Sequence, residues 1–144
     1  MKQNNGRLQT GEHILAKIIE DKIDDAKTGF VRFEEEYGVV EFTTKQDLRE
    51  IDFNELQFEV NGVIQKNFPV KTYVKSREEA EKEIDLRKVP QGITEIRIVD
   101  IGGFDKRACK DPHIENTSQI GNFIIEKVKR VGKDRYRFIF KIKN

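Results

Sequence analysis

Both histidines and the only cysteine of this chain fall into two short segments, each with a spacing of four residues. His13 lies four positions after Gln9, and His113 lies four positions after Cys109. Imidazole nitrogen and thiolate sulfur are preferred zinc ligands, and three protein ligands with one open position are typical of a catalytic site. A single histidine on a helix is more often a packed or surface residue. The three residues together nevertheless predict one Zn²⁺ site, built by His13, Cys109 and His113 from the two ends of the chain.

Size and composition indicate one globular domain over residues 1–144, with residues 1–6 as a flexible tail. Hydrophobic residues make up 36% of the chain and charged residues 37%, and no apolar run approaches the roughly 20 residues of a membrane span. We therefore expect no contact with a membrane. A single cysteine cannot form an internal disulfide, and the N-terminus lacks the apolar segment of a secretory signal, so we expect a cytoplasmic protein.

Hydrophobic periodicity predicts an α+β fold, a largely antiparallel sheet packed against helices. A helix capped by Thr10 or a neighbour carries apolar residues from Ile14 to Ile23 at helical spacing, which places positions 9 and 13 on one face. Further helices are expected over residues 52–65 and 76–84, the second behind a capping-box sequence at Ser76. The expected strands cover residues 30–33, 39–42, 70–74, 93–99, 123–131 and 135–142, and residues 109–121 form a structured loop.

Charge is unevenly distributed along the chain, although the formal net charge is only +1. The stretch from Gly121 to Asn144 contains eight Lys or Arg and two acidic residues. Such a basic segment could meet the phosphates of a nucleic acid. It could equally be the solvated outer face of a hairpin, and the sequence leaves both interpretations open.

Two motifs resemble the editing domain of alanyl-tRNA and threonyl-tRNA synthetases. The segment from Gln9 to His13 resembles the His-x-x-x-His motif that opens this domain. The segment CKDPHIENTSQIG, which begins at Cys109, is similar to its Cys-x-x-x-His motif followed by Asn-Thr-x-x-Ile-Gly. The resemblance covers nearly the whole chain from about Arg7 and leaves no room for an aminoacylation domain. The chain therefore most resembles the short, free-standing alanyl-tRNA editing proteins.

This resemblance implies zinc-dependent hydrolysis, in trans, of serine or glycine from misacylated tRNA(Ala). Gln9 stands where the family has a histidine, and a Gln carbonyl is a poor zinc ligand, so it coordinates weakly or water replaces it. Three ligands and a water still form a workable catalytic site. The alternatives are a zinc-containing tRNA-binding module that has lost catalysis and a small structural zinc protein unrelated to tRNA. The choice between monomer and dimer stays open.

Several polar residues near the predicted metal have both a functional and a structural interpretation. Glu12 is a candidate general base, or a solvated helix residue. Thr10 and Thr28 could hydrogen-bond a serine hydroxyl or a catalytic water, although Thr28 could simply begin a strand. Asn116 and Thr117 could orient His113 or hold the terminal adenosine of tRNA. They could also stabilise their own loop through hydrogen bonds to its backbone.

Glycines and cations complete the predicted substrate surface. Gly102 and Gly103 could let the acceptor end of tRNA approach the backbone, or they could serve a turn. Binding of tRNA also requires Lys and Arg at its phosphates. The candidates flank the predicted metal site or lie on the C-terminal hairpin: Lys106, Arg107, Lys110, Lys127, Lys129 and Arg130.

Overall fold

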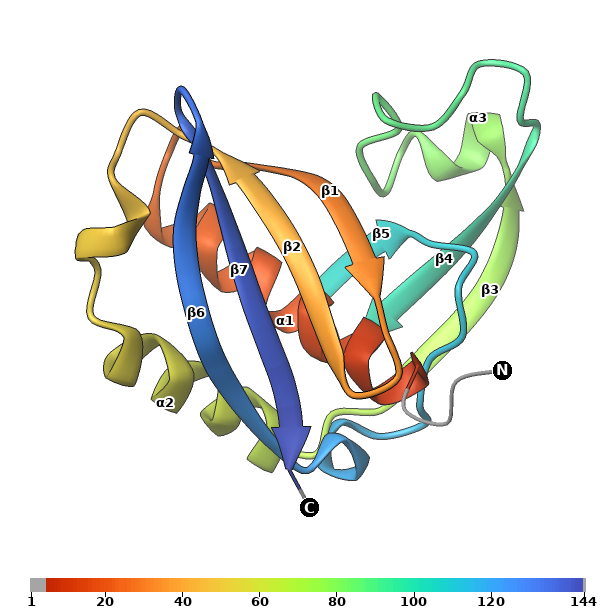
Figure 1. The fold of residues 1–144 in the computed structure, drawn as a ribbon. Coiled ribbons are helices and arrows are strands. Elements are labelled where there is room, and N and C mark those ends of the chain that lie inside the picture. Colours follow the sequence, from red (N-terminus) through yellow and green to blue (C-terminus); the bar gives the residue numbers. More distant parts are fainter. Residues whose placement is uncertain (1–4, 144) are drawn as a thin grey trace.

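The computed structural model describes residues 5–143 and has the predicted α+β architecture (Figure 1). Three α-helices, two short 3-10 helices and seven strands follow one another in the described chain. Their order and bounds are α1 (Asn5–Lys22), β1 (Lys27–Phe33), β2 (Tyr37–Thr43), η1 (Leu48–Glu50), α2 (Phe53–Gln65), β3 (Val70–Ser76), α3 (Arg77–Ala80), β4 (Glu95–Ile101), β5 (Asp105–Ala108), η2 (Thr117–Ile120), β6 (Asn122–Gly132) and β7 (Arg135–Lys143).

The strands form two antiparallel sheets. The larger sheet has the order β1-β2-β7-β6, and the smaller has the order β3-β4-β5. In the larger sheet, Tyr136, Phe138 and Phe140 of β7 point into the core and alternate with more exposed neighbours, as a sheet with one buried face requires. The four-residue strand β5 was not predicted, because Gly102 and Gly103 break the pattern just before it and it is too short for its own alternation to show.

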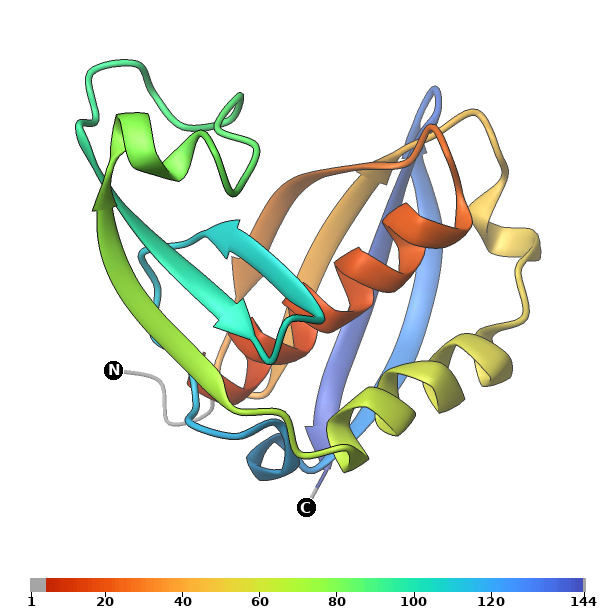
Figure 2. The ribbon, with the colours of Figure 1, turned by 180° about the vertical axis from the view of Figure 1, so that it is seen from behind.

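Helix α1 lies between the two sheets, as the view from behind shows (Figure 2). It contacts β1, β2 and β7 of the larger sheet, and also β5, α2 and η2. Every residue from Leu8 to Ala16 is therefore buried, including polar residues that an ordinary surface helix would turn toward water. Buried polar groups are costly without partners. Helix α1 therefore carries several buried polar side chains, which need partners within the protein or from a ligand.

The predicted elements are found with shifted ends. Asp52 caps α2 by accepting a hydrogen bond from the backbone N–H of Glu55, and Ser76 caps α3 through Glu79. Helix α3 ends at Ala80, and the chain continues as turns. The predicted helix over 76–84 was therefore too long.

The prediction that Thr10 or a neighbour caps the first helix was wrong, because α1 begins at Asn5 and Thr10 lies inside it. Asn5 and Gly6, which the sequence analysis assigned to a flexible tail, belong to the first turn of this helix. The rest of that tail, residues 1–4, lies outside the described part of the chain. Among residues 5–143, no helix has the length and apolar character to cross a membrane.

Candidate metal centre and cleft

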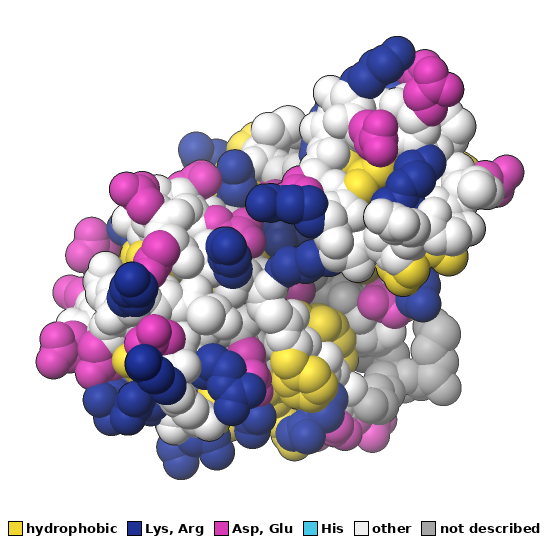
Figure 3. Space-filling view, turned by 90° about the horizontal axis from the view of Figure 1, so that it is seen from above, with side chains coloured by type: hydrophobic (Ala, Val, Ile, Leu, Met, Phe, Trp, Pro, Cys, Tyr) yellow, Lys and Arg dark blue, Asp and Glu magenta, His cyan; other side chains and the backbone are white. Residues whose placement is uncertain are grey.

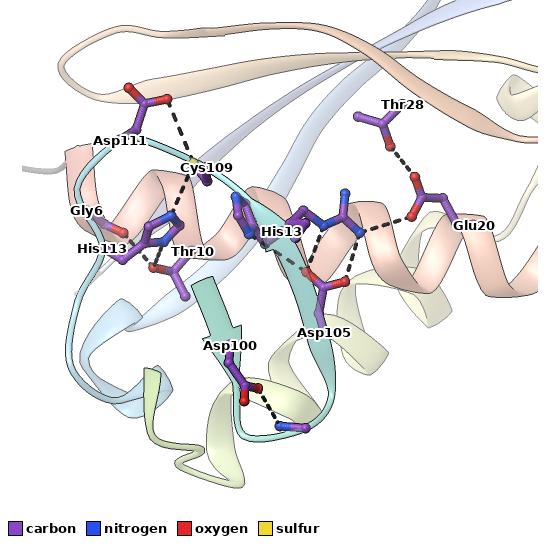
Figure 4. Close-up of polar contacts among 12 residues, drawn as sticks. Gly6, Thr10, His13, Glu20, Thr28, Asp100, Asp105, Cys109, Asp111 and His113 are labelled. Carbon is purple, nitrogen blue, oxygen red and sulfur yellow. Dashed lines mark hydrogen bonds and ion pairs between the residues drawn. The ribbon is translucent and has the colours of Figure 1, made fainter. Parts of the chain in front are cut away.

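The three predicted ligands meet at one point. His13 projects from α1, Cys109 follows the last residue of β5, and His113 lies in the loop beyond (Figure 4). One ligand atom from each lies within 4.8 Å of the other two. The predicted convergence of the two chain ends is therefore found, although residues 13 and 109 are far apart in sequence.

One distance within this cluster suits two ligands of the same zinc ion. Nε2 of His113 lies 3.4 Å from Sγ of Cys109. A nitrogen and a sulfur at usual zinc distances and a tetrahedral angle are about 3.5 Å apart. Burial, helped by His113 and Arg107, holds the pKa of His13 well below its ordinary value, and burial lowers the pKa of His113 to about 4. Both imidazoles are thus neutral at pH 7, as metal ligands must be.

An acidic residue that was not predicted from the sequence lies close to His13. Nδ1 of His13 lies 3.8 Å from Oδ2 of Asp105 and has no hydrogen-bond partner among the described residues. Asp105 in turn accepts hydrogen bonds of 2.8 and 2.9 Å from Arg107. Nδ1 of His13 therefore faces Asp105 from beyond hydrogen-bond distance. A carboxylate behind a ligating histidine is a recurrent arrangement in zinc sites.

The loop that carries Cys109 is held by β4. The backbone N–H of Cys109 donates to the carbonyl of Arg97, and the guanidinium of Arg97 donates to the carbonyls of Cys109 and Asp111 at 2.9 and 2.8 Å. Burial raises the pKa of the Cys109 thiol to about 11. A metal ion must therefore displace the thiol proton in order to bind.

A cleft of about 530 Å³ opens beside this cluster. Its lining includes His13 and Cys109, the edge of β1 at Thr28 and Val31, and the segment around Ile93. This volume falls in the range of small-molecule sites.

Glu12 also lines the cleft, and its expected position on a solvated helix face was wrong. The side chain is buried because α1 is covered on both sides, and its Oε2 has no hydrogen-bond partner among the described residues. Burial raises the pKa of Glu12 to about 7, although Arg107 opposes the shift. Such a carboxyl can exchange a proton near neutral pH.

Gln9 lies one helical turn before His13 and lines the same cleft. It is 4% exposed, and its Nε2 donates to Oδ1 of Asn5 over 3.4 Å. The side chain therefore shares the face of the helix that carries the ligand.

Thr10 and Thr28 lie in different surroundings. The hydroxyl of Thr28 donates to Oε2 of Glu20 over 2.7 Å at the cleft wall, and Oε1 of Glu20 accepts from Arg107 over 3.0 Å. Thr10 is not among the described residues that line the cleft. Its hydroxyl contacts Gly6 and His113 instead.

The remaining candidates for substrate contact are engaged in local structure. Gly102 and Gly103 have positive φ angles of 52° and 79° and form the turn between β4 and β5. Thr117 is fully buried, donates to the carbonyl of Ile64 and accepts from the N–H of Phe68. Asn116 precedes η2. None of these four borders the cleft as the described residues define it.

The predicted cations are dispersed, and Figure 3 shows Lys and Arg interspersed with acidic residues on the upper face. Lys110 lies at the cleft. Arg107 is bound by two carboxylates, and Lys106 pairs with Glu83. Lys127, Lys129 and Arg130 belong to β6; the first two line a separate groove on the outer face of the larger sheet.

Comparison with known proteins agrees with the predicted resemblance. Residues 96–139, which include Cys109 and His113, match the family model of the threonyl and alanyl tRNA synthetase second additional domain. The alanyl-tRNA editing protein AlaX-M of Methanosarcina acetivorans is 32% identical over 142 residues, which cover 93% of this chain and 56% of that protein. The chain is therefore similar to an alanyl-tRNA editing protein over most of its own length.

Other members of this group show the same relationship. AlaX-M of Saccharolobus solfataricus is 33% identical over 149 residues, which cover 95% of this chain and 58% of that protein. AlaX-L of Pyrococcus horikoshii is 30% identical over 137 residues, with 94% of this chain and 33% of that protein covered. The chain thus spans a little over half the length of its AlaX-M relatives.

Asp105, Glu20 and Arg97 are the site residues that sequence reasoning missed. Asp105 and Arg107 are two positions apart, and this spacing places side chains on one face of a strand. Glu20 is two turns beyond His13 on the same helix. The spacing of Asp105 and Arg107 is informative only once β5 is recognised, whereas the predicted helix already placed Glu20 two turns beyond His13.

Proposed function

We propose that this chain binds one Zn²⁺ through His13, Cys109 and His113 and hydrolyses, in trans, the ester of serine or glycine on misacylated tRNA(Ala). The observation that carries the proposal is the convergence of these three ligands beside a cleft of substrate size. The names of the relatives support an editing role. We further propose that the chain acts as a single editing domain in the cytoplasm.

The proposed reaction needs an activated water, a proton acceptor and a polarised carbonyl. Zinc, when bound, supplies Lewis acidity toward the ester carbonyl and makes a water more acidic. Glu12 offers an unpaired Oε2 in the same cleft, so we assign it the role of proton acceptor. Nδ1 of His13 lies 3.8 Å from Asp105, so we assign Nε2 as the ring nitrogen that would hold the ion.

Thr28 supplies the proposed contact to the amino acid. Its single hydroxyl proton is donated to Glu20, so Oγ1 can only accept further hydrogen bonds. A serine hydroxyl can donate to that oxygen, whereas the methyl group of alanine cannot. A polar contact of this kind can discriminate effectively between serine and alanine on the tRNA.

For tRNA, we retain Lys110 as the proposed phosphate contact nearest the reacting ester, because it lies at the cleft. Lys127, Lys129 and Arg130 remain proposals for contacts farther along the acceptor arm. Arg107 is omitted, because its guanidinium already pairs with Asp105 and Glu20. We also omit Lys106, which pairs with Glu83. Residues 102, 103, 116 and 117 are omitted because they do not border the cleft.

The decisive experiment is a deacylation assay with seryl-, glycyl- and alanyl-tRNA(Ala), run with the protein as purified, after chelation, and after zinc is restored. We expect release of serine or glycine, loss of activity with the chelator and recovery with zinc. The Cys109→Ala variant should be inactive while its sheet content is retained. Deacylation that persists in zinc-free protein would exclude the proposed chemistry.

A second candidate is a zinc-containing tRNA-binding module without catalysis. The observation in its favour is Gln9, whose amide replaces the family histidine and bonds to Asn5 instead. In that case the protein would retain zinc and bind the misacylated tRNA in a filter assay, yet leave the ester intact at every protein concentration.

A further inference from the structure

The hydroxyl of Thr10 has one proton and two close polar neighbours. Its Oγ1 lies 2.9 Å from the carbonyl oxygen of Gly6 and 2.8 Å from Nδ1 of His113 (Figure 4). A carbonyl oxygen can only accept, so the proton of the hydroxyl is donated to Gly6. The contact with His113 is then a hydrogen bond only if Nδ1 carries a proton and donates it to Thr10.

Protonation of Nδ1 determines what the other ring nitrogen can do. In a neutral imidazole only one nitrogen carries a proton, so Nε2 of His113 has a free lone pair. That atom lies 3.4 Å from Sγ of Cys109, within the metal-ligand cluster. The opposite tautomer would direct an N–H at the position of the ion and prevent coordination.

We infer that Thr10 is a positioning residue that selects the Nδ1–H tautomer of His113 and thereby presents Nε2 to a metal ion. The inference rests on the metal site of the proposed function. It gives Thr10 a different role from the substrate contact predicted from the sequence. Thr10 acts through His113 and need not touch the substrate.

Two features of the fold make this arrangement specific. Thr10 is fully buried, so water does not compete for its hydroxyl. Gly6 lets the loop approach α1, because a Cβ there would lie only 3.3 Å from the carbonyl carbon of His113. The carbonyl that takes the Thr10 proton and the ring that donates to Thr10 are thus brought together by the same glycine.

The test compares Thr10→Val, which removes the hydroxyl but keeps the shape, with Thr10→Ser, which keeps the hydroxyl. Thr10→Ala is measured alongside as a variant with good helix propensity, in case valine prevents folding. Thr44→Val is the matched control, since Thr44 is also buried, donates to Asp25 and accepts from the N–H of Gln46, all outside the metal cluster.

Two readouts are needed, and neither requires tRNA. Long-range ¹H–¹⁵N spectra of the metal-free protein report which ring nitrogen of His113 is protonated, and competition with a chelator reports the affinity for Zn²⁺ alone. We expect Nδ1–H in the wild type and in Thr10→Ser. In Thr10→Val and Thr10→Ala we expect loss of this preference and zinc binding that is about 10- to 100-fold weaker. Thr44→Val should leave both readouts unchanged.

Variants without the hydroxyl that keep the Nδ1–H tautomer, or bind zinc within twofold of the wild type, would overturn the inference. Its failure is distinguishable from failure of the proposed function. A Thr10-dependent tautomer and zinc affinity in a protein that does not deacylate tRNA refute only the proposed function. Zinc-dependent deacylation in a protein whose tautomer and affinity are indifferent to Thr10 refutes only this inference.

Discussion

Replacement of Asp105 by asparagine will destabilise the protein, whereas the same replacement at Asp85 will not. Both aspartates precede an arginine by two residues and bind its guanidinium through both carboxylate oxygens. The pairs differ in burial. The side chains of Asp105 and Arg107 are 4% and 24% exposed, whereas those of Asp85 and Arg87 are 57% and 83% exposed.

The expected loss in the free energy of unfolding follows from the hydrogen bonds that asparagine can keep at position 105. Asn offers one acceptor oxygen, so one of the two hydrogen bonds from Arg107 is lost. A hydrogen bond to a charged group contributes roughly 1.5–3 kcal/mol. Glu20 still accepts from Arg107, and burial raises the pKa of Asp105, so the buried carboxylate itself carries a desolvation cost. We therefore expect a loss of about 2 kcal/mol in the free energy of unfolding, less than the roughly 3–5 kcal/mol typical of a broken buried ion pair.

The measurement is the free energy of unfolding from urea titration at pH 7, for both variants and the wild type. A loss of about 2 kcal/mol in a domain of this size corresponds to a Tm lower by roughly 6 °C. Asp85→Asn changes the net charge equally and should match the wild type within error, because exposed pairs contribute little. Equal stabilities of the two variants would refute the reasoning that burial makes the Asp105–Arg107 pair contribute more to the free energy of unfolding than the exposed pair does.

Three further outcomes are expected. Glu12→Gln, which preserves shape, should lower kcat for deacylation at least about a hundredfold while zinc affinity stays within twofold; an unchanged kcat would remove Glu12 as proton acceptor. Gln9→His should tighten zinc by at least about tenfold in chelator competition, since position 9 shares the cleft face with the ligand of the next turn; no change would show that it does not reach the ion. Hydrogen bonds from Lys75 and Lys106 lower the pKa of Glu83 to about 2, so its contribution to stability is present above the unfolded pKa of about 4.5 and disappears as pH falls toward 2. The Tm difference between wild type and Glu83→Gln should therefore vanish over that window, and a difference that persists below pH 2 would contradict this assignment.

The three candidate ligands and most of the helices and strands could be predicted from the sequence alone. Scarce residue types at a spacing of four identify His13, Cys109 and His113, because no other side chains of the chain offer imidazole or thiolate. Local patterns also predicted the helix over 52–65 and the C-terminal hairpin, since periodicity and caps are properties of neighbouring residues.

The packing of the helices and sheets was needed to show which of the other polar residues lie beside the candidate ligands. The helical periodicity places Glu12 on the polar side of α1, where a solvated side chain is expected. The side chain is nevertheless buried, because the smaller sheet covers that side of the helix. Thr10 makes its contact with His113 across 103 residues of chain, and Asp105 faces His13 only after the turn at Gly102 and Gly103 returns β5 to the helix. Such contacts depend on how elements pack, and the spacing of residues along a single element does not encode that packing.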